Sequence, residues 1–294
     1  MMALKLGIIG GSGLYNFSEL ENKKTIPASL GPFGQPSADI EYGIIDEVEI
    51  FFLPRHGKNH IYSPSNVPYR ANIDTLKRLG CNDLISVSAV GSLKEELSPG
   101  RFVLVDQFID RTFLRKKTFF DKGIVAHVSV AEPTCKLTAK LVAQSALNSG
   151  IDIVNGGTYL AMEGPQFSTV AESKLYKSWG CDVIGMTNMP EAKLAREAEI
   201  RYVSIAMVTD YDCWRENTDH VAVDEIIKTL ANNADKAKLL IKSFVKEFKE
   251  NRPDTIDGID NVLDTSIITS NFSKEDLIKS GLDGIASRII NASK

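Results

Sequence analysis

The chain of 294 residues carries 34 Lys and Arg against 38 Asp and Glu, a formal net charge of -4, and 43% of its residues are hydrophobic. This composition excludes a disordered, collagen-like or disulfide-scaffold protein. The mildly acidic balance argues against a nucleic-acid or membrane-surface binder, because such proteins present basic surfaces. At roughly 150 residues per domain, the length is compatible with one or two domains.

The cysteines are scattered and form no C-x-x-C pair, so the sequence indicates neither a zinc site nor a disulfide framework. The N-terminus is interrupted by glycines and lacks the apolar core and cleavage site of a signal peptide. No window approaches the ~20 apolar residues that span a bilayer. We therefore expect a cytoplasmic protein, or a nuclear one if the source is eukaryotic.

Short apolar runs alternate with helical patterns along the first half of the chain, which is typical of an α/β fold. We expect strands over residues 4–9, 48–53, 84–89 and 102–105 and a helix over residues 68–79. In the second half, helices are expected over residues 134–149 and 190–199 and strands over residues 153–162, 182–186 and 202–209.

Thr169 and Glu172 form a capping box that predicts a helix reaching Trp179. Residues 222–248 predict a long amphipathic helix, followed by a polar stretch and a last helical segment that begins at Ser273. We therefore expect one α/β domain over residues 1–249, with a mixed central sheet flanked by helices in three layers. Residues 250–294 are expected to form a helical appendage.

A glycine-rich turn, Gly10-Gly11-Ser12-Gly13, follows the first predicted strand. It does not match the dinucleotide fingerprint, because the third glycine position holds Asn16 and no clean helix follows. Two interpretations stay open: the turn presents its amides and the Ser12 hydroxyl to an anion, or it is an ordinary strand-end turn.

Several polar side chains lie where predicted strands end, which is where open α/β sheets bind ligands. Each of these residues alone is weak evidence for a binding site. Together, however, the hydroxyls, the guanidinium and the imidazole suit a tetrahedral oxyanion such as phosphate. These residues are Ser12, Arg55, His56, Ser88 and Thr187.

Asp210 and Asp212 follow another strand and, as i and i+2 positions of an extended segment, are expected to point to the same side. Two carboxylates in one pocket repel, so one is expected to keep its proton and to act as a general acid toward a heterocycle. The alternative is a solvated loop or cap pair. Nearby, Val223, Ile226 and Ile227 form a helical stripe that is either plain core or the apolar wall of a pocket.

Eight segments along residues 7–245 closely resemble the 5'-methylthioadenosine phosphorylases of the trimeric purine nucleoside phosphorylase superfamily. They are residues 7–14 (GIIGGSGL), 54–60 (PRHGKNH), 69–76 (YRANIDTL), 86–93 (SVSAVGSL), 106–112 (DQFIDRT), 163–173 (EGPQFSTVAES), 185–187 (GMT) and 209–214 (TDYDCW). The resemblance implies a single α/β phosphorylase domain, assembled as a homotrimer, that needs no metal or organic cofactor.

The resemblance also implies roles for individual residues. Phosphate would be bound by Ser12, Arg55, His56, Ser88, the Ala89 backbone and Thr187. The nucleoside would contact Phe167, Ser168, Met186, Asp210, Tyr211 and Asp212, with His60 near the ribose. The 5'-methylthio group would lie against Val223, Ile226, Ile227 and His127, the last from a neighbouring subunit.

The subfamily is indicated by the residues expected at the base. Inosine and guanosine phosphorylases typically carry Glu in place of Ser168 and an Asn at the base, whereas Ser168, Asp210 and Asp212 favour a 6-aminopurine. Ser168 and Val223 are therefore the expected specificity residues. Gln166 and Asn188 depart from the usual family pattern, and residues beyond 250 do not align with the family tail.

The implied reaction is phosphorolysis of 5'-methylthioadenosine to adenine and 5-methylthioribose 1-phosphate, with Asp210 and Asp212 as the catalytic pair. Three other readings stay open: a phosphorylase for adenosine, inosine, guanosine or methylthioinosine, a hydrolase that uses water, and a nucleotide-binding module without turnover. The set of anion-binding side chains argues against the hydrolase, and the acid pair argues against the module.

Overall fold

The computed structural model describes residues 3–11, 20–215 and 223–292, with side chains in the last range from residue 228 onward. In this part of the chain, eleven strands form one mixed sheet. They are β1 (Lys5–Gly10), β2 (Glu21–Ile26), β3 (Ile40–Ile45), β4 (Val48–Pro54), β5 (Asp83–Ser92), β6 (Phe102–Val105), β7 (Gln107–Asp110), β8 (Ile153–Asn155), β9 (Thr158–Ala161), β10 (Val183–Gly185) and β11 (Arg201–Asp210).

The helices connect these strands or follow them in the tail. They are α1 (Tyr69–Arg78), α2 (Lys136–Asn148), α3 (Val170–Ser178), α4 (Glu191–Glu197), α5 (Val223–Asn251), α6 (Leu263–Ser266), α7 (Lys274–Lys279) and α8 (Ser287–Asn291), with short 3-10 turns at Lys58–His60 and Pro64–Asn66. Among the helices of the described ranges, none is long and apolar enough to cross a membrane.

Four neighbouring strands, β4, β1, β5 and β11, run parallel, so their carboxyl ends meet at one edge of the sheet. β5 lies at the centre and also pairs with β10, which runs antiparallel to it. The register places Ala206 beside Ser88 and Asp210 beside Gly91. The topology therefore brings the polar residues at these strand ends to one place.

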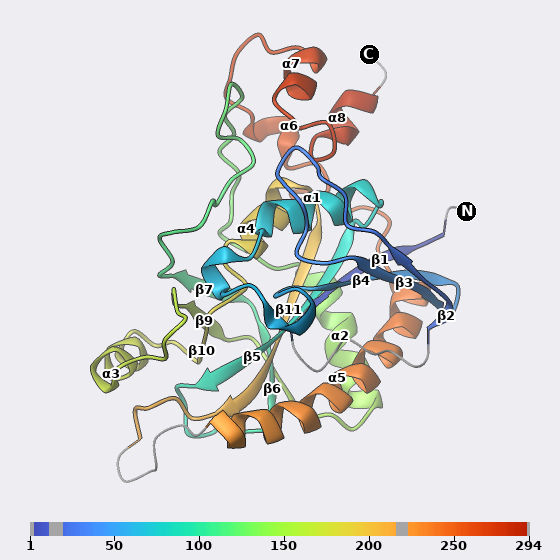
Figure 1. Cartoon of the computed structure of the whole chain (residues 1–294). Helices are drawn as coiled ribbons and strands as arrows, with labels where there is room; N and C mark the ends of the chain where they lie inside the picture. The colour runs from blue at the N-terminus through green and yellow to red at the C-terminus, as the bar shows by residue number, and fades with distance from the viewer. Residues whose placement is uncertain (1–2, 12–19, 216–222, 293–294) are drawn as a thin grey trace.

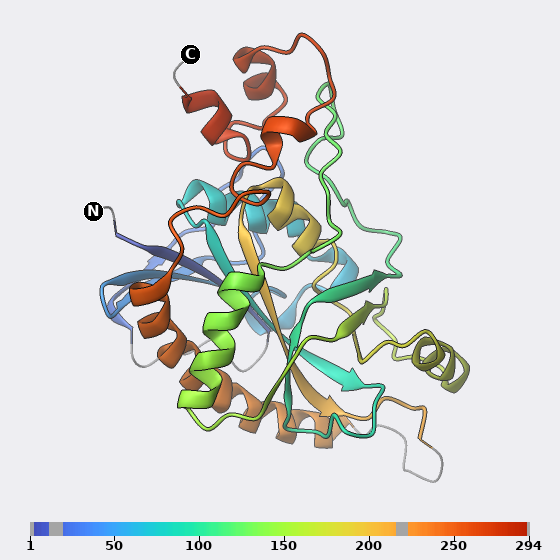
Figure 2. The same ribbon diagram turned by 180° about the vertical axis from the view of Figure 1, so that it is seen from behind.

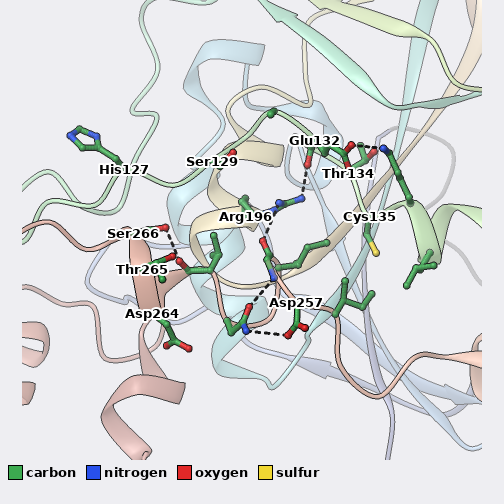
Figure 3. Close-up of a pocket in the computed structure, with 18 residues that line it drawn as sticks. His127, Ser129, Glu132, Thr134, Cys135, Arg196, Asp257, Asp264, Thr265 and Ser266 are labelled. Atoms are coloured by element: carbon green, nitrogen blue, oxygen red, sulfur yellow. Dashed lines mark hydrogen bonds and ion pairs between the residues drawn. The ribbon is translucent and has the colours of Figure 1, made fainter.

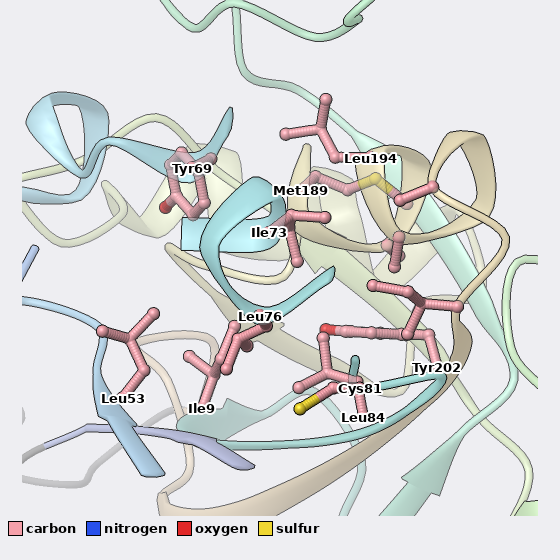
Figure 4. Packing of buried hydrophobic residues seen from close by; sticks show 14 of the residues in the cluster. Ile9, Leu53, Tyr69, Ile73, Leu76, Cys81, Leu84, Met189, Leu194 and Tyr202 are labelled. Carbon is pink, nitrogen blue, oxygen red and sulfur yellow. The ribbon is translucent and has the colours of Figure 1, made fainter. Parts of the chain in front are cut away.

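The sheet has a hydrophobic core on each face, which gives the expected three layers. α1 and α4 cover one face, and α2 and α5 cover the other (Figures 1 and 2). Figure 4 shows the first core at close range, where Ile73 and Leu76 of α1 lie over Ile9 and Leu84 of the sheet. The predicted α/β fold with a mixed sheet flanked by helices is confirmed.

The tail after α5 packs onto the first of these cores. Leu277, Leu282 and Ile285 are fully buried and belong to the same hydrophobic cluster as α1 and α4. In Figures 1 and 2 the helices α6, α7 and α8 lie beside the long segment between β7 and α2. A backbone bridge between Ala126 and Ile267 joins these two segments.

Most predicted elements are present within a few residues of their expected bounds, and the Thr169 capping box is confirmed. The single strand expected over residues 153–162 is wrong: Gly156 and Gly157, with φ of 86° and 151°, turn the chain between β8 and β9. The strand expected to end at Ala89 continues through Ser92, and the predicted boundary at residue 249 falls inside α5.

Candidate active site

A pocket of about 620 Å³ lies at the edge of the sheet where β4, β5 and β11 end. Residues of these strands, of β10 and of the loops that follow them line it. Ten residues predicted for the site are among the lining residues: Arg55, His56, His60, Ser88, Ala89, Phe167, Met186, Thr187, Asp210 and Asp212.

Arg55 follows β4 and is only 1% exposed. Glu191 at the start of α4 holds its guanidinium in a bidentate pair, with Nε donating to Oε2 at 2.8 Å and Nη2 to Oε1 at 3.2 Å. Nη2 also donates to the Ser86 hydroxyl, and Nη1 donates to the carbonyl of Val87. One Nη1 proton is thereby left for a ligand. Burial, the largest single influence, lowers the pKa of Arg55, but the charge of Glu191 and its hydrogen bond, with smaller contributions from Tyr202 and Tyr69, together raise it by more, so the guanidinium stays charged.

His56 is buried beside Arg55, and its Nδ1 lies 2.9 Å from the carbonyl oxygen of Tyr62. A carbonyl only accepts, so Nδ1 carries the proton and Nε2 has a free lone pair. Burial and the charge of Arg55 lower the pKa of His56 to about 4, so the imidazole is neutral at pH 7. Its ring stacks on His60 with centroids 4.2 Å apart.

The Ser88 hydroxyl is buried in the pocket wall and has no hydrogen-bond partner of normal geometry among the described residues. Buried hydroxyls are rarely left unpaired, so this one marks a place where a ligand is expected to bind. Thr187 follows β10 and donates its hydroxyl proton to Asn188 Oδ1 at 2.9 Å. The pocket therefore has a polar end formed by Arg55, His56, Ser88 and Thr187.

Asp210 and Asp212 both lie against Gly91 of β5. A Cβ at Gly91 would be 3.0 Å from Asp210 Oδ1 and 3.3 Å from the Asp212 Cβ. The absence of a side chain at Gly91 thus makes room for the two acids. Both side chains therefore lie in one pocket, as expected from the sequence, although Asp212 lies in the turn after β11 and not in an extended segment.

The two carboxyl groups have raised pKa values, chiefly because they are buried. Burial raises the pKa of Asp210 to about 6, opposed by a hydrogen bond from the Thr209 hydroxyl and reinforced by the charge of Asp212. Burial also raises the pKa of Asp212, and the Ser173 hydroxyl opposes that shift. Repulsion between the acids, the cause expected from the sequence, is the smaller contribution at Asp210.

Two of the other predicted residues, Ser168 and Tyr211, are described by the structure and do not line this pocket. Ser168 is next to the lining residue Phe167, and its carbonyl accepts a hydrogen bond from the Cys213 thiol. Tyr211 donates its hydroxyl proton to the Glu95 carbonyl at 3.1 Å. Ser12 and the side chains of Val223, Ile226 and Ile227 lie outside the described residues.

His127 lines a separate pocket of about 840 Å³ between the segment before α2, the helix α4 and the tail (Figure 3). Arg196 lies at the centre of this view and donates to the backbone carbonyls of Glu132 and Gly258. None of the other predicted site residues lines it. Within one chain, His127 is therefore not part of the cluster that holds the acids.

A family model described as the phosphorylase superfamily matches residues 5–246. The chain belongs to this superfamily. Among similar members, the S-methyl-5'-thioadenosine phosphorylase of Cereibacter sphaeroides is 52% identical over 98% of this chain and 99% of its own. That of Bradyrhizobium diazoefficiens is 53% identical over 97% of this chain and 98% of its own. The resemblance to methylthioadenosine phosphorylases is confirmed.

Solved structures of other superfamily members have the same fold. A methylthioadenosine phosphorylase from an antarctic soil metagenomic library has a TM-score of 0.89 and 45% identity, covering 96% of this chain and 99% of its own. The enzyme of Schistosoma mansoni in complex with adenine has a TM-score of 0.83 and 35% identity, covering 90% of this chain and 99% of its own. The match to the Cereibacter protein spans 289 residues, so it includes most of the tail.

Sequence reasoning missed the residues that hold the polar end in place. Glu191 is separated from Arg55 by 136 positions, and nothing in its local pattern indicates a buried ion pair. Ser86 carried a usable signal, because it lies two residues before Ser88 on the same face of one strand. Asn188 is expected from the sequence only as a departure from the family pattern, yet it is completely buried and accepts a hydrogen bond from the Thr187 hydroxyl.

Proposed function

We propose that the protein catalyses phosphorolysis of 5'-methylthioadenosine. The observation that carries the proposal is one pocket lined both by the polar end (Arg55, His56, Ser88, Thr187) and by the buried acids Asp210 and Asp212. A chain about half identical to S-methyl-5'-thioadenosine phosphorylases over its whole length supports the same reading.

In this reaction a phosphate oxygen forms a bond to C1' of the ribose as the bond from C1' to N9 of adenine breaks. The electron pair of that bond passes to the base, and Asp210 donates its proton to N7 so that adenine leaves neutral. Asp212 accepts a hydrogen bond from the N6 amine. A positioned general acid of this kind contributes about 10²–10⁴-fold to the rate.

The phosphate binds at the polar end of the pocket, and Ser12 adds a hydroxyl. The nucleoside contacts Phe167, Ser168, Met186, Tyr211 and His60, and the 5'-methylthio group lies against Val223, Ile226 and Ile227. Inorganic phosphate is the co-substrate, with no metal or organic cofactor. We expect this salvage enzyme in the cytoplasm.

We expect a homotrimer in which His127 of one subunit reaches the 5' end of a neighbour's pocket. Two apolar residues that line the pocket support an assembly, because Phe167 is 59% exposed and Ile61 is 68% exposed in the single chain. Both lie at the same pocket, and exposed apolar surface gathered at one place is a feature of interaction sites and ligand-binding grooves.

The preferred purine base is tested by comparing the turnover of 5'-methylthioadenosine, adenosine and inosine, each supplied with phosphate. The proposal predicts fastest turnover of methylthioadenosine and poor turnover of inosine, because two carboxyl groups suit an amine and a protonated ring nitrogen. The Ser168→Glu variant, which introduces the residue typical of inosine phosphorylases, should shift the substrate preference toward inosine. Inosine as the best substrate of the unaltered protein would refute the proposal.

A further inference from the structure

A buried hydrogen-bond network fixes the direction of several protons behind the polar end of the pocket. It begins at Glu191, which is 1% exposed and is kept ionised by the charge of Arg55 and by its hydrogen bonds, although burial acts against this. An ionised carboxylate only accepts. The hydroxyls of Ser86 and Tyr202 therefore both donate to its Oε1, at 2.5 and 2.9 Å.

This direction determines how the Asn188 amide is oriented. Because Ser86 and Tyr202 direct their protons at Glu191, their oxygens present lone pairs to Asn188 and require its Nδ2 there, at 3.2 and 2.8 Å. Nδ2 also lies 2.8 Å from the Ser204 hydroxyl. The amide oxygen Oδ1 must then face Thr187.

Asn188 in turn fixes the Thr187 hydroxyl. Thr187 Oγ1 lies 2.9 Å from Asn188 Oδ1 and donates its only proton there. The Tyr159 hydroxyl is 3.5 Å away on another side. What Thr187 offers to a ligand in the pocket is therefore a lone pair, so it acts as an acceptor.

His56 offers a second acceptor to the same end of the pocket. Its Nδ1 proton is directed at the Tyr62 carbonyl, so the lone pair of Nε2 is the group available to a ligand. The free Arg55 proton and the Ser88 hydroxyl are donors. A bare oxyanion can pair with the donors but leaves both acceptors unsatisfied.

We infer that this subsite recognises phosphate through its P–OH proton, with Thr187 and His56 as acceptors and Asn188 as the positioning residue that keeps Thr187 in that role. The inference rests on the proposed function, since it names how the co-substrate is bound. Phosphate near neutral pH always carries at least one such proton. Oxyanions of the same size and charge without a proton are expected to bind more weakly, because a buried acceptor left unpaired costs binding.

The probe is fluorophosphate, a dianion in which fluorine replaces the hydroxyl of hydrogenphosphate. Its inhibition constant against phosphate is compared with the dissociation constant of phosphate, both measured at pH 7.5. We expect fluorophosphate to bind about ten- to a hundredfold more weakly than phosphate. Equal binding of the two anions by protein that turns over methylthioadenosine would overturn the inference, whereas absence of phosphate-dependent turnover would instead overturn the proposed function.

The Asn188→Gly variant tests the positioning role. The φ of Asn188 is +68°, which glycine adopts without strain, and loss of the amide frees the Thr187 proton to point into the pocket. Discrimination between the two anions should then fall several-fold, while the matched Ser204→Ala variant, which leaves the contact between Asn188 and Thr187 intact, should keep it. Unchanged discrimination in Asn188→Gly would contradict the role. If that variant does not fold, Thr187→Val removes the acceptor itself and should give the same loss.

Discussion

Asp210 Oδ1 lies 3.0 Å from the point where Gly91 would carry a Cβ. Strand β5 therefore presents bare backbone to the catalytic pair proposed here, and the pair occupies the space that a side chain would need. Ile184 Cγ2 lies 3.2 Å from the same point, so a side chain at Gly91 would be crowded from two directions.

The Gly91→Ala variant should consequently lose activity more than stability. We expect kcat/KM for methylthioadenosine to fall at least about tenfold, because even small displacement of a catalytic group is costly, with about 1–3 kcal/mol of destabilisation from overpacking. Steady-state kinetics and urea unfolding measure the two effects. Phosphate binding is the internal control, and its loss together with catalysis would indicate a general distortion instead.

The acid role of Asp210 predicts the pH dependence of the reaction. With the pKa of Asp210 raised to about 6, the protonated acid predominates below that pH and is lost above it. We expect kcat/KM for methylthioadenosine to decline as pH rises through about 6. The Asp210→Asn variant should be slower by about 10²–10⁴-fold and should lack this decline. A decline caused by the ionisation of phosphate would instead persist in the variant. Near-normal turnover by this variant would exclude the acid assignment.

The same pKa predicts a gain in stability when the charge is removed. A carboxyl whose pKa rises on folding favours the folded state below its unfolded value of 3.8, and this contribution is lost as pH rises through about 6. At pH 7.5, Asp210→Asn should be more stable than the unaltered protein by roughly 2–3 kcal/mol. Urea unfolding at pH 7.5 and pH 4 measures the difference in the free energy of unfolding between the variant and the unaltered protein. If that difference does not shrink at pH 4, ionisation of Asp210 is not its cause.

Helices α7 and α8 are expected to be an integral part of the fold, although the family model ends before them. Leu282 is fully buried in the same cluster as α1, so Leu282→Ala should cost about 2–5 kcal/mol. Ile278, on the same part of the tail, is 52% exposed, and Ile278→Ala should change stability little. Chemical unfolding measures the stability of both variants. Similar effects of the two substitutions would mean that the tail does not pack into the hydrophobic core that includes α1.

The sequence predicted strands β1 and β4 well because each ends at a turn residue, Gly10 in β1 and Pro54 in β4. It did not predict β3 or β7. It missed β2, whose residues ENKKTI are mostly exposed and show no alternation of polar and apolar groups. That strand exists because β3 supplies its hydrogen bonds, which no local pattern reveals.

For the site, the positions of the predicted strand ends were enough to predict a cluster, because parallel strands bring their carboxyl ends to one edge of the sheet. The partners behind the cluster were not predictable in the same way. Glu191 pairs with Arg55, and Asn188 contacts Ser204, only through the folding of segments distant along the chain. Such pairings depend on tertiary packing, which the spacing of residues in one segment does not encode.

Phosphorolysis is tested most directly by measuring the release of adenine from methylthioadenosine with and without inorganic phosphate, with the sugar product followed by ³¹P NMR. Phosphorolysis releases adenine only when phosphate is present and gives a new signal from 5-methylthioribose 1-phosphate in equal amount. Adenine release at the same rate without phosphate, giving the free sugar, would contradict it.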